Sequence, residues 1–136
     1  MDARLIPFRA NVDPRGTLTA IEEPEHVPFP IKRVFLVHDV EPGVPRGGHA
    51  HMDTDQVILA AHGSLNVRVT DGESEATFAL TDPTYGLYVA RMLWVDLLDF
   101  TEETSCVVLA STNYDQSRSY RTWNDYLVGI GKDADG

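Results

Sequence analysis

The amino-acid sequence predicts an all-β domain, either a sandwich or a small barrel, with one short helix near its C-terminus. Short segments rich in β-branched and aromatic residues recur at roughly 8–12-residue spacing, with turn-forming residues between them. The segment 65–70 alternates along its length, so that Leu65, Val67 and Val69 share one face of a strand. A closed barrel of such strands has an interior that can hold one small ligand.

Turn signals and apolar runs define the expected elements in chain order. The motif DPRG at 13–16, the hairpin signal DG at 71–72 and the segments at 81–86 and 101–104 predict turns. Two Pro and three Gly predict a loop over 41–48. The expected strands lie at 17–23, 29–40, 49–51, 56–61, 65–70, 75–80, 87–100 and 105–111, and WNDYLVGI at 123–130 predicts the helix.

Length, charge and cysteine content limit the classes of protein. A chain of 136 residues fits a single domain, which we expect over 1–130, followed by a flexible tail over 131–136. The net charge of −10 argues against nucleic-acid and anionic-membrane partners, although a local cluster of its Arg residues could still hold a small anion. The sequence shows neither an apolar run long enough to span a membrane nor a signal peptide. Its single cysteine, Cys106, lies in an apolar run, which is consistent with a reducing compartment, so we expect a cytoplasmic protein.

The segment RGGHAHMDTDQ at 46–56 carries the chemistry that the sequence offers. His49 and His51 are two apart, so on a strand they project from the same face. They could be metal ligands, proton-transfer groups or merely structural histidines. Neutral imidazoles near physiological pH suit acid–base catalysis, whereas a transition-metal site usually has three or four protein ligands. We therefore expect neither a metal nor another cofactor.

The spacing around these histidines resembles the first motif of the cupin superfamily. Gly43, His49, His51 and Gly63 fit the pattern G-X5-HXH-X3,4-E-X6-G, but Gln56 stands where metal-binding cupins have Glu. The expected second-motif region, GLYVARMLWVDL, contains no His. The resemblance implies a double-stranded β-helix, or jelly-roll, barrel with its site inside.

A longer set of segments is similar to the nucleotide-sugar 3,4-ketoisomerases. DPRGTLTAIEE, VPFPIKRVF, PRGGHAHMDTDQ, HGSLNVRVTDG, YGLYVARMLWVDLLDF and VVLASTNYD occur in one order, so the resemblance covers roughly residues 5–126. It implies a metal-free isomerase that converts a TDP-4-keto-6-deoxyglucose to its 3-keto isomer. It also implies an intertwined homodimer.

The implied chemistry gives each candidate residue a role. His51 is our choice for the base that acts at carbon and His49 for the oxygen shuttle, although the two could exchange roles. The enediolate intermediate needs positive charge or hydrogen bonds, and the diphosphate and thymine need cations and aromatic rings. The candidates for these tasks are Arg46 and Gln56 for the enediolate, Arg15 and Arg33 for the diphosphate, and Tyr88 and Tyr114 for thymine or sugar.

One departure from the family leaves other functions open. Val95 follows Trp94 where the family usually has a basic residue, and Asp96 should face the opposite side of the strand. The alternatives are a related sugar-nucleotide epimerase, a metal-dependent cupin and a sugar-nucleotide binding module without activity.

Overall fold

The computed structural model describes residues 1–132 and consists mainly of antiparallel strands. The elements in chain order are β1 (Ala3–Pro7), β2 (Arg9–Asp13), β3 (Gly16–Ala20), β4 (Arg33–His38), β5 (Arg46–His51), β6 (Gln56–His62), β7 (Leu65–Thr70), β8 (Glu75–Leu80), β9 (Tyr85–Val89), β10 (Trp94–Leu98), β11 (Ser105–Ala110), the 3₁₀ turn η1 (Gln116–Arg118), β12 (Ser119–Tyr120) and α1 (Trp123–Gly129). The predicted all-β class and the short C-terminal helix are confirmed.

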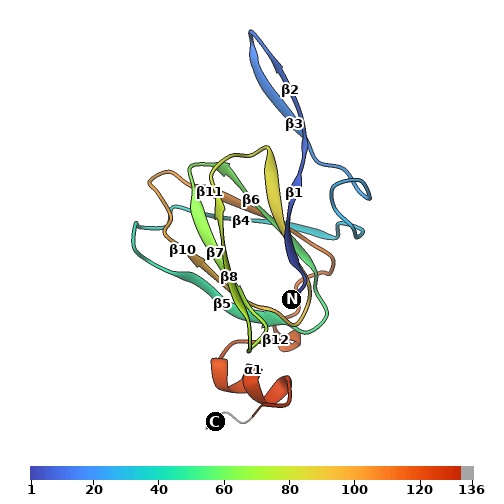
Figure 1. The fold of residues 1–136 in the computed structure, drawn as a ribbon, viewed down its shortest axis with the longest axis vertical. Helices are drawn as coiled ribbons and strands as arrows, with labels where there is room; N and C mark the ends of the chain where they lie inside the picture. The colour runs from blue at the N-terminus through green and yellow to red at the C-terminus, as the bar shows by residue number, and fades with distance from the viewer. Residues whose placement is uncertain (133–136) are drawn as a thin grey trace.

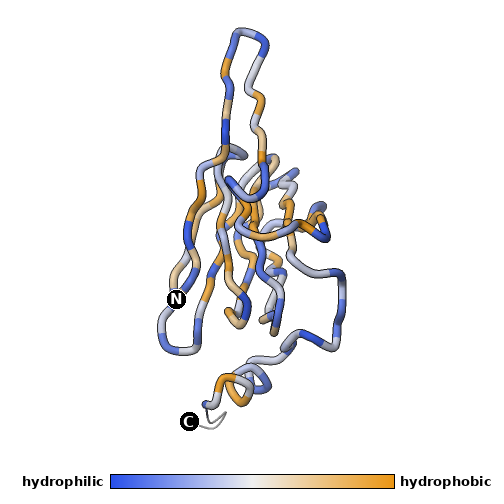
Figure 2. The backbone as a smooth tube through the Cα atoms, turned by 90° about the vertical axis from the view of Figure 1, so that its right-hand side faces the viewer, coloured by the Kyte–Doolittle hydropathy of each residue, from blue (hydrophilic) through white to orange (hydrophobic). Residues whose placement is uncertain are grey.

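Two five-stranded sheets form the barrel, with strand orders β1-β9-β6-β11-β4 and β12-β5-β10-β7-β8 (Figure 1). Each sheet contains strands that are distant in the sequence, as in a jelly roll. The hairpin β2–β3 leaves the barrel as an arm, and α1 lies at the other end of the molecule. Figure 2 shows the arm and the C-terminal segment projecting from opposite ends.

The main core lies between the two sheets. Leu65, Val67 and Val69 of β7 are buried on one face, as their alternation predicts, and pack there with Ile58 and Val108. A second cluster covers the outer face of the first sheet, where Val57 and Leu59 pack against Phe29. Because both faces of β6 are covered, five consecutive residues from Gln56 to Ala60 are buried.

Three parts of the structure differ from the predicted elements. β1, β2 and β12 lie where no strand was expected, and the run 87–100 divides at Arg91 and Met92 into β9 and β10, which belong to different sheets. The end of the expected loop 41–48 is strand, because β5 begins at Arg46. Of the expected tail, residues 133–136 lie outside the described residues, while Lys132 donates to the Gly72 carbonyl at 2.9 Å.

A bulge explains how two consecutive glycines fit into β5. Gly47 and Gly48 have φ values of 86° and 73°, and the pairing register with β10 shifts opposite them between Val95 and Asp96. A Cβ at Gly47 would lie 2.9 Å from the Val95 carbonyl oxygen, so only glycine fits without strain. The bulge immediately precedes His49 and sets the direction in which β5 enters the site.

Candidate active site

The two histidines of β5 project into one cavity between the sheets. The cavity has a volume of about 430 Å³, which is within the usual range for a small-molecule site. The rings of His49 and His51 are parallel, with an interplanar angle of 1° and centroids 6.3 Å apart. Phe35, Leu36, Val37, Ile58, Val95, Leu97 and Val108 give the cavity apolar walls, and its polar lining comes from Arg33, Arg46, Gly47, His49, His51, Gln56, Tyr114 and Arg121.

The surroundings of both histidines favour the neutral imidazole. Burial and, next, the charge of Arg121 lower the pKa of His49, while a backbone hydrogen bond at Gly47 and the charge of Asp96 act in the opposite direction. Burial, followed by the charges of His49 and Arg33, lowers the pKa of His51 to about 4. Both side chains are therefore proton acceptors at neutral pH.

Each imidazole has a polar partner at its Nε2 atom. The side-chain amide nitrogen of Gln56 lies 3.2 Å from Nε2 of His51, and a guanidinium nitrogen of Arg121 lies 3.1 Å from Nε2 of His49. Gln56 begins β6 and is buried, so it faces the cavity from the other sheet. The residue that replaces the cupin carboxylate thus contacts a histidine through an uncharged group.

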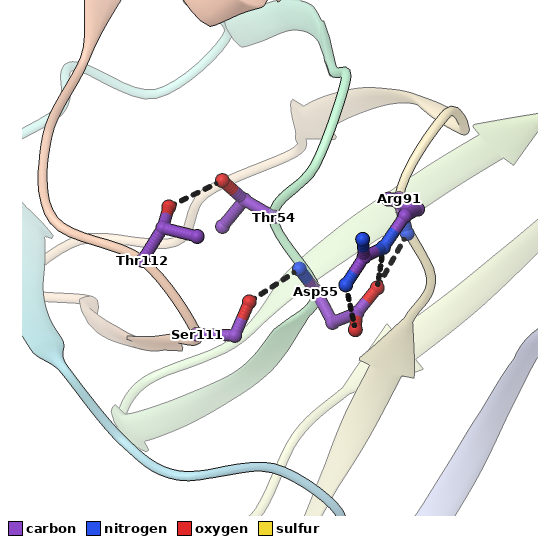
Figure 3. Close-up of polar contacts among 5 residues, drawn as sticks. All are labelled: Thr54, Asp55, Arg91, Ser111 and Thr112. Atoms are coloured by element: carbon purple, nitrogen blue, oxygen red, sulfur yellow. Dashed lines mark hydrogen bonds and ion pairs between the residues drawn. The ribbon is translucent and has the colours of Figure 1, made fainter.

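Hydrogen bonds outside the cavity hold the chain that leads into Gln56. Asp55 accepts two hydrogen bonds from the side chain of Arg91, at 3.2 and 3.1 Å, and its backbone N–H donates to the Ser111 hydroxyl (Figure 3). The hydroxyls of Thr54 and Thr112 are 2.6 Å apart. These contacts connect the start of β6 to the β9–β10 turn and to the segment after β11, and thereby fix the position of Gln56.

A second cavity of about 290 Å³ adjoins the first. Arg33, His51, Tyr114 and Arg121 line both cavities. The guanidinium of Arg33 lies 5.3 Å from the centre of the Tyr114 ring, and the Tyr114 side chain is largely exposed. A ligand longer than one hexose could therefore extend from the histidines past Arg33 and Tyr114.

Six of the eight predicted site residues line the main cavity, and two do not. Arg15 lies at the tip of the β2–β3 arm, where its exposed side chain pairs with Asp13. Tyr88 packs in the second hydrophobic cluster against Phe29, with Arg4 over its ring. The structure therefore brings neither residue to the cavity of its own chain.

Two further cavity residues bear on the sequence interpretation. Val95 pairs with His49 across β5 and β10 and forms part of the cavity wall, while Asp96 binds Arg68 instead, as strand parity predicts. Arg121 was not predicted, because nothing near it in the sequence marks it. Its place in the cavity follows from the pairing of β12 with β5, and a pairing between strands so distant in the sequence leaves no local pattern.

Among residues 1–132, no three His, Cys, Asp or Glu side chains converge as a metal site would require. Cys106 is buried, as expected, and burial raises the pKa of its thiol to about 12. The described part of the chain contains no helix long and apolar enough to cross a membrane.

The two-sheet barrel, with two parallel imidazoles projecting into the cavity between its sheets, is the architecture of a cupin. Over residues 1–130 the sequence matches the family described as FdtA: WxcM-like, C-terminal. The chain belongs to this family.

Comparisons with individual proteins agree with this assignment. The chain is 37% identical over 139 residues to the TDP-4-oxo-6-deoxy-alpha-D-glucose-3,4-oxoisomerase of Aneurinibacillus thermoaerophilus, and the alignment covers 100% of both chains. A 3,4-ketoisomerase structure from Helicobacter canadensis is 32% identical, with a TM-score of 0.93 over 97% of this chain and 99% of that one. QdtA, a sugar 3,4-ketoisomerase from Thermoanaerobacterium thermosaccharolyticum solved with TDP, is 35% identical, with a TM-score of 0.91 over 95% and 94% of the chains. The predicted family, cupin fold and isomerase class are confirmed.

Proposed function

We propose that the cavity isomerises a TDP-4-keto-6-deoxyhexose to the 3-keto sugar by proton transfer, with His49 and His51 as the catalytic groups. The observation that carries this proposal is the pair of parallel imidazoles in one cavity, whose surroundings lower the pKa of both rings. Two neutral imidazoles that face one ligand can move protons between two adjacent carbons of that ligand and between the oxygens on those carbons. Proton transfer between carbons and between oxygens requires neither a metal nor an oxidant. Metal independence of this protein stays a prediction.

The reaction proceeds through an enediol. The 4-keto group acidifies the hydrogen on C3, and His51 accepts that proton while the C3–H electrons form the C3=C4 bond and O4 becomes an oxyanion. His49 then moves a proton from the C3 hydroxyl to O4. The electrons released at O3 form the new C3 ketone, and C4 takes a proton from His51. Atoms and charge balance, because the sugar gains and loses the same number of protons.

Arg33 and Arg46 fit the anionic part of the substrate. Each lines the cavity and has no ion-pair partner among residues 1–132, whereas Arg68 and Arg91 are paired with carboxylates. In a protein of net charge −10, unpaired guanidiniums in an apolar cavity form a local site for a diphosphate or an enediolate. We assign Arg33 to the diphosphate and Arg46 to the oxyanion.

Tyr114 and Gln56 complete the site. Tyr114 is exposed beside Arg33 and lines the second cavity, so its ring is available to stack on thymine. Gln56 contacts His51 and can hold its ring in the orientation needed to reach C3. Because Gln56 has no charge, it supports His51 without stabilising the protonated form.

We also propose that the protein functions as a homodimer through the arm and the free edge of β4. The arm exposes Val12 and Leu18, and the edge strand β4 exposes Val34 and Leu36. An unpaired edge with apolar side chains favours pairing with another strand, and the arm of a second copy supplies one. Arg15, at the tip of the arm, can then contribute only to the site of the partner subunit.

Proton NMR in D₂O tests the reaction with TDP-4-keto-6-deoxyglucose as substrate. We expect migration of the ketone to C3, with deuterium at C4 to the extent that the proton on His51 exchanges with solvent before it is returned. His51→Asn should abolish turnover but retain TDP binding, and His62→Asn, which changes an exposed histidine, is the matched control. Deuterium at C5 would instead indicate an epimerase, and TDP binding without migration of the ketone would indicate a binding module.

Calorimetry with TDP tests the assignment of Arg33. Charge-assisted hydrogen bonds contribute about 1.5–3 kcal/mol each, so Arg33→Met should weaken TDP binding about 10–100-fold. Arg4→Met removes the same charge from a residue that packs on Tyr88, outside the cavity. Equal affinities of the two variants would remove Arg33 from the diphosphate site.

A further inference from the structure

Arg121 contacts a catalytic histidine although it is distant from that residue in the sequence. One of its guanidinium nitrogens lies 3.1 Å from Nε2 of His49, across a separation of 72 residues. A guanidinium can only donate hydrogen bonds and keeps its proton at any pH relevant to proteins. Nε2 of His49 is therefore the acceptor and carries no hydrogen, so the hydrogen of the neutral ring is on Nδ1.

The second ring nitrogen is consistent with this tautomer. A backbone hydrogen bond at Gly47 acts to raise the pKa of His49, which is the effect of a carbonyl that accepts from a ring N–H. With Nε2 occupied by Arg121, that N–H is on Nδ1. The effect of Gly47 on the pKa therefore agrees with the tautomer that the Arg121 contact assigns.

The fold holds Arg121 at this position by strand pairing. β12 is antiparallel to β5, with Ser119 opposite His51 and Tyr120 opposite Ala50. Continuing this register by one residue puts Arg121 opposite His49. Arg121 is thus the cross-strand neighbour of His49, and side chains directly opposite each other in antiparallel strands lie close together.

An aromatic cluster anchors the segment on both sides of Arg121. The Tyr120 ring packs against Tyr126 of α1 at 6.0 Å, and Trp94 of β10 packs against Trp123 and Tyr126 at 5.4 and 5.6 Å. Thr122 caps the helix by accepting a hydrogen bond from the Asp125 N–H at 3.2 Å. Arg121 is itself exposed, so its contact with His49 depends on this anchoring of the neighbouring residues rather than on burial.

We propose that Arg121 is a positioning residue that fixes the tautomer of His49 and keeps its Nε2 unprotonated. This inference rests on the function proposed above, in which His49 moves a proton between two sugar oxygens. When a sugar hydroxyl replaces Arg121 as the hydrogen-bond donor to Nε2 of His49, this nitrogen carries no hydrogen and can accept the proton of the hydroxyl. Once His49 is protonated, the fixed charge of Arg121 disfavours the imidazolium, so the proton passes on to the other oxygen.

Several charges besides Arg121 face His49 and enter any pH measurement. Arg46 on β5 acts with Arg121 to lower the pKa, Asp96 on β10 acts to raise it, and His51 lies next to the ring. Because these groups remain in an Arg121 variant, a change in His49 that follows the substitution reports on Arg121 itself.

NMR of the ¹⁵N-labelled protein without substrate tests the proposal directly. In the unmodified protein we expect His49 to be neutral at pH about 7.5, with its hydrogen on Nδ1. In Arg121→Met the hydrogen should shift toward Nε2 and the pKa of His49 should rise. Arg121→Lys, which keeps a charge and a donor, should restore both values at least in part, and Arg4→Met should change neither. A hydrogen on Nε2 in the unmodified protein would overturn the proposal, even if a variant failed to fold.

Kinetics separate this role from simple substrate binding. Loss of a proton-transfer partner should reduce kcat of Arg121→Met about 10–100-fold with a smaller change in KM. A raised KM with unchanged kcat would mean that Arg121 only binds substrate, and would overturn the positioning role. Failure of the unmodified protein to turn over would count against the proposed function instead, and would leave the tautomer result interpretable.

Discussion

Lowering the pH from about 8 to about 6 is expected to leave kcat/KM almost unchanged. His51 must be neutral to accept a proton from carbon, and burial, followed by the charges of His49 and Arg33, lowers its pKa from 6.5 to about 4. Because its pKa is lowered, the imidazole of His51 remains neutral at lower pH than an ordinary histidine does. Activity should therefore be lost near the folded-state pKa of about 4, and not near the ordinary value of 6.5.

The expected difference is large enough to measure. At about pH 6 a base with a pKa of about 4 is about 99% neutral, whereas a base with a pKa of about 6.5 is about 24% neutral. An unperturbed histidine would thus lose about three quarters of its activity over the range in which this protein should lose almost none.

Two measurements together test this prediction. Initial rates at substrate concentrations below KM, followed by NMR from about pH 3.5 to about pH 8.5, give the acid limb of kcat/KM, which reports on the free enzyme. Titration of the His51 ring signals without substrate gives its pKa directly. Arg33→Gln removes one of the charges that lower this pKa, so the midpoint should rise. Arg4→Gln, the control, makes the same change of charge outside the cavity.

A fourfold fall in kcat/KM with a midpoint near 6.5, together with a His51 ring that titrates at the same pH, would refute the reasoning. It would mean that burial, the first cause of the lowered pKa, does not act on His51. Identical His51 midpoints in Arg33→Gln and Arg4→Gln would refute the contribution of Arg33 while leaving that of burial intact.

Two further substitutions test the surroundings of the site. Gln56→Glu puts a carboxylate beside Nε2 of His51, which should raise the pKa of the imidazole and move the acid limb of kcat/KM to higher pH, whereas the uncharged Gln56→Met should not move it. Tyr126→Phe removes the hydroxyl that donates to the Met92 carbonyl at 2.8 Å from a fully buried ring, so the free energy of unfolding should fall by about 1–3 kcal/mol in urea denaturation. The control is Tyr120→Phe, and equal losses in the two tyrosine variants would contradict the role of this hydrogen bond.

Local patterns in the sequence determined much of this protein. The alternation over 65–70, the hairpin signal at 71–72 and the apolar run at 105–111 predicted strands that the structure contains. The two-residue spacing of His49 and His51 placed both rings on one face of a strand, because successive side chains of a strand alternate between faces. The cupin-like spacing then predicted the barrel, and the longer ordered set of segments predicted the family to which the chain belongs.

Tertiary structure alone decided which other residues reach the histidines. Arg15 and Tyr88 have suitable side chains, but one lies on an arm that leaves the barrel and the other packs on the outer face of a sheet. Arg121 reaches His49 only because β12 pairs with β5, which joins residues 72 positions apart. Pairing between distant strands depends on how the whole chain closes into a barrel, so no local pattern of residues encodes it.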